Sequence, residues 1–138
     1  MGRRVDNTVE FPLRTQEDVV LVRQKTRSQA VAIGLSLVDQ TKFVTAASEL
    51  ARNTVIHGGG GTVRLEIVEA SLKRGIRLTF EDQGPGIRDV EQALRDGYTT
   101  GTGMGLGLGG ARRLASEFMI DSKPGVGTKV TITQWTKQ

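Results

Sequence analysis

The chain has 138 residues, a formal net charge of +4, 37% hydrophobic residues and no cysteine. This length and composition predict one globular domain over residues 1–138, and the lack of cysteine excludes a disulfide scaffold, a thiolate metal site and a cysteine nucleophile. With one Trp, one Tyr and four Phe, few side chains are available to stack on bases, so no nucleic-acid partner is expected. No apolar run is long enough to predict a membrane span. The composition fits the reducing cytoplasm, and the oligomeric state stays open.

The first half of the chain predicts one strand and two helices. Pro12 favours an edge position for the strand, and Thr15 followed by Asp18 is typical of a capped helix start. The predicted elements are an edge strand at Thr8–Leu13, a helix at Gln16–Ile33 ended by Gly34, and a second helix capped by Asp39 that runs to Ile56.

The second half predicts four strands and two further helices. Apolar residues alternate with polar ones in two runs around Leu65 and Leu78, which is the period of a half-buried strand. The expected elements are strands at Val63–Ile67 and Ile76–Asp82, a short helix at Asp89–Asp96, a helix at Gly110–Glu117, and strands at Phe118–Ser122 and Thr128–Gln134. This order predicts an α/β two-layer sandwich, with helices on one face of a mixed sheet.

Polar side chains interrupt the apolar patterns at three places. Glu49 and Asn53 are four residues apart on the second helix, so they share a face at the border of its apolar stripe. Asp82 continues the core-facing row of its strand, where a carboxylate needs a donor, and Thr128 begins the core-facing row of the last strand. Each has an ordinary alternative: an exposed helix face, a carboxylate that caps the next turn, and a threonine that favours strands.

Glycine is concentrated in one stretch, where six of the ten residues of Gly101–Gly110 are glycine. Free backbone N–H groups before a helix are typical of an anion site, whereas a flexible hinge is the alternative. The apolar residues between the glycines favour a loop that docks. A dinucleotide-binding fold is not favoured, because no strand directly precedes the stretch.

Taken together, the motifs resemble the GHKL superfamily of ATP-binding domains. Glu49-Leu-Ala-Arg-Asn53 is similar to its N box, Asp82-Gln-Gly-Pro-Gly86 to its G1 box, Gly101–Leu108 to its G2 box, and Gly127-Thr128 to its final GT element. All four occur in the family order. Within the superfamily the runs SELARN and DGYTTGTGMGLGLGG resemble RsbT-type serine/threonine kinases of bacterial partner-switching pathways.

The resemblance implies a role for each motif residue. Glu49 would be the catalytic residue that orients or deprotonates a seryl hydroxyl, Asn53 would ligate Mg²⁺, and Asp82 would accept a hydrogen bond from the adenine of ATP. The remaining residues expected to contact the nucleotide are Gly84, Gly86, Gly101, Gly103, Met104, Gly105, Leu106, Gly107 and Thr128.

The resemblance also implies partners. The expected substrate is a serine of a STAS-domain antagonist protein, and the expected second partner is a phosphatase or a sigma factor. An alternative function is an anti-sigma factor that sequesters a sigma factor and uses nucleotide as a switch. Glu49 at the expected spacing favours the kinase, and the complete set of motifs argues against a decayed nucleotide site.

Overall fold

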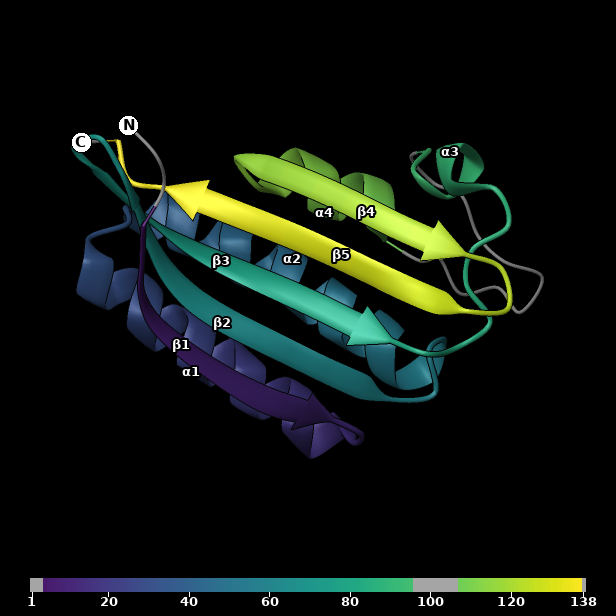
Figure 1. Ribbon diagram of the computed structural model, residues 1–138. Coiled ribbons are helices and arrows are strands. Elements are labelled where there is room, and N and C mark those ends of the chain that lie inside the picture. The colour runs from purple at the N-terminus through teal and green to yellow at the C-terminus, as the bar shows by residue number, and fades with distance from the viewer. Residues whose placement is uncertain (1–3, 96–106, 138) are drawn as a thin grey trace.

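The computed structural model describes residues 4–95 and 107–137. Five strands form one sheet in the order β1-β2-β3-β5-β4, and the helices lie on one side of it (Figure 1). The elements are β1 Arg4–Leu13, α1 Gln16–Ile33, α2 Leu37–Ile56, β2 Gly61–Ala70, β3 Lys73–Asp82, α3 Val90–Ala93, α4 Leu108–Leu114, β4 Glu117–Lys123 and β5 Gly127–Trp135.

The predicted two-layer α/β sandwich is confirmed, but its sheet is antiparallel throughout and not mixed. The connection from β1 to β2 explains the difference, because it contains two helices, α1 and α2. One helix between neighbouring strands returns the chain to the same end and gives a parallel pair. The second helix reverses the chain once more, so β2 runs opposite to β1.

The hydrophobic core lies between the sheet and the helices α1, α2 and α4. The alternation predicted from the sequence is confirmed, since the core-facing row of β3 contains Ile76, Leu78 and Phe80, which are all buried. Phe43 and Leu50 of α2 pack against this row from the helical layer. Burial of such side chains contributes about 1.5–3 kcal/mol each, and it fixes which face of every strand points to the helices.

Local signals set the helix ends, and one of them was assigned wrongly. Thr15 caps α1 in a capping box with Asp18, as predicted, and Gly34 ends the helix in the left-handed conformation at φ 93°. The cap of α2 is Ser36 and not Asp39, because the Ser36 hydroxyl accepts a hydrogen bond from the Asp39 N–H at 3.1 Å. Of the shorter helices, α3 spans fewer residues than expected, and α4 begins and ends a few residues earlier.

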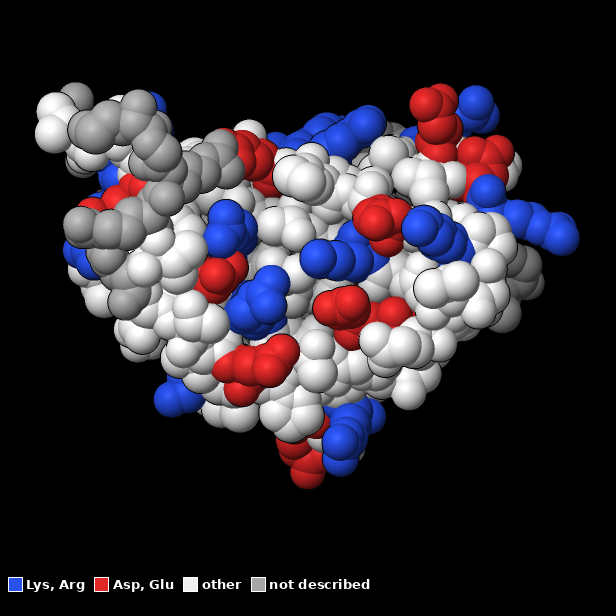
Figure 2. Space-filling model, in the orientation of Figure 1, with Lys and Arg blue, Asp and Glu red and all other residues white. Residues whose placement is uncertain are grey.

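The face of the sheet opposite the helices carries charged side chains of both signs. Figure 2 shows Lys and Arg interspersed with Asp and Glu over this face. Arg77 donates to Glu66 at 2.9 Å, and Arg64 lies 3.8 Å from the same carboxylate. The paired charges keep this face of the sheet polar.

Candidate functional site

A cavity of about 260 Å³ lies where α2 and β3 end and β5 begins. Its inner wall is apolar and is formed by Leu50, Phe80, Leu108 and Val130, while polar groups stand around them. The full lining is Leu50, Asn53, Thr54, His57, Gly58, Phe80, Asp82, Pro85, Gly86, Ile87, Arg88, Leu108, Thr128 and Val130. An apolar pocket with a few converging polar groups is the usual form of a small-molecule site.

Asp82 and Thr128 stand opposite each other at this edge. They are register partners in the antiparallel pair β3–β5, and both line the cavity. One carboxylate oxygen of Asp82, Oδ1, accepts a hydrogen bond from the Gly84 N–H at 2.9 Å. The alternative reading of Asp82 as a turn cap is therefore correct for one oxygen. A carboxylate has two acceptor oxygens, and no described residue donates a hydrogen bond to Oδ2.

Ser122 positions Thr128, and the sequence reasoning missed it. The Ser122 and Thr128 hydroxyls lie 2.8 Å apart, and the Ile87 N–H donates to Ser122 Oγ at 2.8 Å. Ser122 therefore joins the last hairpin to the segment that carries Gly86 and Ile87. The contact depends on the register of β4 against β5, in which Ser122 faces Thr128, so only a prediction of that register would have revealed it.

Two glycines allow the walls of the site to close around Asp82. A Cβ on Gly58 would lie 2.6 Å from Cβ of Asp82 and 2.5 Å from its Oδ2, and a Cβ on Gly84 would lie 2.7 Å from the carbonyl oxygen of Gly58. Gly58 follows α2 directly, where its N–H donates to the Asn53 carbonyl at 3.0 Å. The run of four glycines Gly58–Gly61, directly after α2, is the sequence signal for this close packing.

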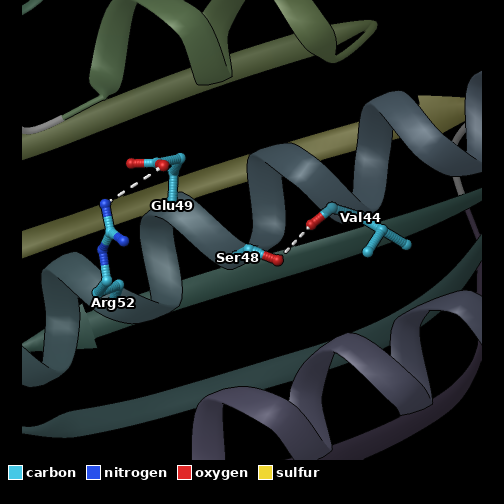
Figure 3. Close-up of polar contacts among 4 residues, drawn as sticks. All are labelled: Val44, Ser48, Glu49 and Arg52. Atoms are coloured by element: carbon cyan, nitrogen blue, oxygen red, sulfur yellow. Dashed lines mark hydrogen bonds and ion pairs between the residues drawn. The ribbon is translucent and has the colours of Figure 1, made fainter. Parts of the chain in front are cut away.

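Glu49 and Asn53 come from the same helix but differ in position. Asn53 lines the cavity, whereas Glu49 lies beside it with its carboxylate against Gly107, the residue that precedes α4. Arg52 Nη2 lies 3.4 Å from Glu49 Oε1, and the Glu49 side chain is 35% exposed (Figure 3). The structure thus pairs Arg52 with Glu49.

The structure brings most of the other predicted residues to this edge. Gly86 lines the cavity, Gly84 packs behind Asp82, and Gly107 packs against Glu49. His57, at the end of α2, and Arg88 also line the cavity. Five predicted residues lie outside the described part of the chain, namely Gly101, Gly103, Met104, Gly105 and Leu106.

The donor set limits the metals that the site can hold. Among the described residues there is no group of three or more His, Cys, Asp or Glu side chains that could hold a metal ion. A magnesium ion often takes only one or two protein ligands and completes its shell with phosphate and water. One amide oxygen, as on Asn53, fits that pattern. Over residues 4–95 and 107–137, no helix has the length and apolar character to cross a bilayer.

Comparisons with known proteins agree with this geometry. Residues 38–138 match the family described as histidine kinase-, DNA gyrase B-, and HSP90-like ATPase. The serine/threonine-protein kinase RsbT of Bacillus subtilis is 40% identical over 125 residues, which cover 91% of this chain and 94% of that protein. An anti-sigma F factor of Halalkalibacterium halodurans is 34% identical over 67% of this chain and 66% of that protein.

Solved structures share the fold. The structure of the RsbU and RsbW domains of Rv1364c from Mycobacterium tuberculosis superposes with a TM-score of 0.65 at 24% identity. That match covers 94% of this chain, which spans about a third (32%) of the solved chain. A mycobacterial sensor histidine kinase, MprB, superposes with a TM-score of 0.55 at 19% identity, over 91% of this chain and 97% of that one. The predicted GHKL fold and the kinship with RsbT-type serine/threonine kinases are confirmed.

Proposed function

Because the chain belongs to the histidine kinase-, DNA gyrase B- and HSP90-like ATPase family, we propose that its cavity binds ATP and that it phosphorylates a serine of a partner protein. The observation that carries this proposal is the arrangement of four residues on three elements, β3, β5 and α2. Asp82 and Thr128 meet at the cavity across two strands, while Asn53 lines it from α2 and Glu49 lies one helical turn before Asn53.

The cavity suits the base of a nucleotide. Its volume of about 260 Å³ is close to the lower end of small-molecule pockets, roughly 300 Å³, so it holds a base and leaves the phosphates outside. The Asp82 Oδ2 atom is available to accept a hydrogen bond from an exocyclic amino group. Thr128, oriented by Ser122, adds a hydroxyl that can donate or accept. This pair favours adenine, which presents a donor beside acceptors.

Phosphate and magnesium would lie toward α4. Asn53 would supply one oxygen to Mg²⁺, whose charge neutralises the phosphates of ATP. The backbone N–H groups of the glycine stretch, from Gly101 to Gly107, would hold the phosphate oxygens. Glu49 lies on the same side of the cavity, next to Gly107, so the expected position of the γ-phosphate is close to its carboxylate.

Glu49 would act on the acceptor hydroxyl. It orients the seryl O–H and accepts its proton as the serine oxygen bonds to the γ-phosphorus, while the bond from that phosphorus to the β–γ bridging oxygen breaks and ADP leaves. A side chain that is 35% exposed can be reached by a residue of another protein. This exposure favours a protein acceptor over a small molecule enclosed in the cavity.

The similarity to RsbT supports the acceptor class. We expect a serine on a STAS-domain antagonist, followed by exchange to a phosphatase partner. The test combines purified protein, γ-labelled ATP, magnesium and that antagonist, with Glu49→Gln beside the wild type. Label on a serine of the antagonist, reduced at least about 100-fold in Glu49→Gln with ATP affinity retained, supports the proposal. Glu10→Gln, on the exposed edge strand, is the matched control.

A second function, sequestration of a sigma factor, is supported by the anti-sigma F factors of several bacteria that are similar to this chain. It predicts a stable complex with a sigma factor in the presence of nucleotide. Transfer to the antagonist without any such complex would exclude it. A complex without transfer would exclude the kinase.

A further inference from the structure

A second hollow lies on the helical layer, between α1 and α2. This groove, called here the α1–α2 groove, has a volume of about 480 Å³ and is lined by Val20, Arg23, Gln24, Arg27, Ser28 and Val44. None of these residues lines the nucleotide cavity. The groove is therefore a separate surface feature, and the functional roles assigned above do not use it.

The groove carries apolar side chains that the fold leaves in contact with solvent. Val20 is 45% exposed although α1 has a well-buried face of its own. Val31, which is 56% exposed, follows eleven residues later and so lies on nearly the same line along the helix, because successive residues turn by about 100°. This stripe of α1 faces away from the core, and exposed valines beside a hollow are the kind of surface that another protein can cover.

The same stripe carries two unpaired positive charges. Arg23 and Arg27 are both exposed, and neither makes an ion pair with any described residue. They are four residues apart on one helix, where like charges repel each other and weaken the helix. The fold gains nothing from this placement. Carboxylates of a partner would remove the repulsion, and the nearby apolar groove would accept a side chain between them.

The groove adjoins Glu49 across the outer surface of α2. Val44 lines the groove, and the Ser48 hydroxyl donates to the Val44 carbonyl at 2.8 Å (Figure 3). At about 100° per residue, Ser48 lies between Val44 and Glu49 around the helix. Glu49 faces the side where α4 begins, and the width of one helix, about 10 Å, separates it from the groove. Three or four extended residues span that distance.

We propose that the α1–α2 groove docks the protein acceptor. An acidic segment of the acceptor places an apolar side chain against Val20 and Val44, its carboxylates pair with Arg23 and Arg27, and the seryl hydroxyl then reaches Glu49 across α2. The proposal rests on the proposed kinase function, because it assigns the groove to the protein that receives the phosphoryl group. The acceptor is thereby recognised by charge and apolar contact outside the nucleotide cavity.

The test compares two charge reversals on the same helix. Arg27→Glu changes the groove, whereas Lys25→Glu makes the same change in charge at an exposed position two residues away, outside the groove lining. The probe is the STAS-domain antagonist, titrated by calorimetry without ATP and used as the substrate in transfer assays. We expect Arg27→Glu to raise the dissociation constant and KM for the antagonist at least about tenfold, because reversal replaces attraction by repulsion. The kcat and ATP affinity should stay unchanged, and Lys25→Glu should behave as the wild type.

The other outcomes separate the two proposals. Normal transfer and normal antagonist binding in Arg27→Glu would overturn the docking site and leave the kinase intact. A second outcome is that the wild type binds the antagonist but transfers no label, and that Arg27→Glu no longer binds it. This result would support the docking site and refute the kinase. If Arg27→Glu instead dissociates a dimer of this chain in sedimentation and binds the antagonist normally, the groove is a contact between two copies. A wild type that does not bind the antagonist at all overturns both.

Discussion

The substitution Gly58→Ala tests the nucleotide site through one methyl group. A Cβ at Gly58 would lie 2.6 Å from Cβ and 2.5 Å from Oδ2 of Asp82, well inside the usual contact distance of about 3.5 Å. The carboxylate would have to move by about 1 Å, because Gly58 is held by its N–H bond to the Asn53 carbonyl. A hydrogen bond to a charged group contributes about 1.5–3 kcal/mol, so loss of the Asp82 bond to adenine should weaken ADP binding by roughly 10-fold to 100-fold.

Calorimetric titration with ADP measures this loss, and two further variants interpret it. Gly110→Ala is the matched control, because a Cβ there meets nothing within 4 Å, and replacing a helical glycine should stabilise the protein by about 0.5–1 kcal/mol without affecting ADP. Asp82→Asn should reproduce the loss in ADP affinity. If Gly58→Ala binds ADP as tightly as the wild type while Asp82→Asn does not, the carboxylate tolerates displacement. If both bind normally, Asp82 does not recognise the base.

Two further predictions concern ion pairs and caps. Arg52→Ala should leave ADP affinity within about twofold of the wild type and slow transfer to the antagonist by about twofold to fivefold, because an exposed pair such as Arg52–Glu49 contributes about 0.2–1 kcal/mol; a tenfold loss of ADP affinity would instead place Arg52 at the nucleotide. The backbone N–H of Arg14, with that of Thr15 and the Thr15 hydroxyl, lowers the pKa of Asp18. Asp18→Asn should therefore lower the free energy of unfolding, and this loss should be greatest above about pH 4, the ordinary pKa of Asp. As the pH falls further, through the lowered pKa of Asp18 in the folded protein, the difference from the wild type should shrink. Thermal unfolding from pH 7 to pH 3 measures it, and a difference that stays constant with pH would contradict the assignment.

The pairing of Asp82 with Thr128 shows what strand periodicity can predict. Side chains alternate strictly along a strand, so both residues could be assigned to the core-facing rows of their strands without any structure. That the two residues face each other could not be predicted without the register of β3 against β5, which places the last residue of one core-facing row beside the first residue of the other. The mixed sheet was a wrong prediction although both helices between β1 and β2 were predicted, because two helices in that connection already give an antiparallel pair.

Local alternatives of similar energy account for most of the other differences. Ser36 and Asp39 are both good cap residues three positions apart, and each could begin α2 by its own chemistry. The selected cap, Ser36, leaves Asp39 buried inside the first turn. Arg52 could be excluded from the Glu49–Asn53 face by angle, yet residues three apart on a helix still meet when one side chain is long. Ser122 depends on a hairpin register that no local pattern specified.

Under the proposed function, the helix α2 would separate stability, nucleotide binding and acceptor chemistry by direction around its axis. Phe43 and Leu50 anchor it in the core, so substitutions there should act through unfolding. Asn53 lines the cavity, whereas Glu49 lies outside it and is partly exposed. Because a straight helix moves as one body, the position of Glu49 relative to bound nucleotide is fixed by the same core contacts that fix Asn53. Under the proposed function, a partner that covers the outer face of α2 would therefore meet a carboxylate already aligned with the nucleotide, and it would need to supply only the hydroxyl.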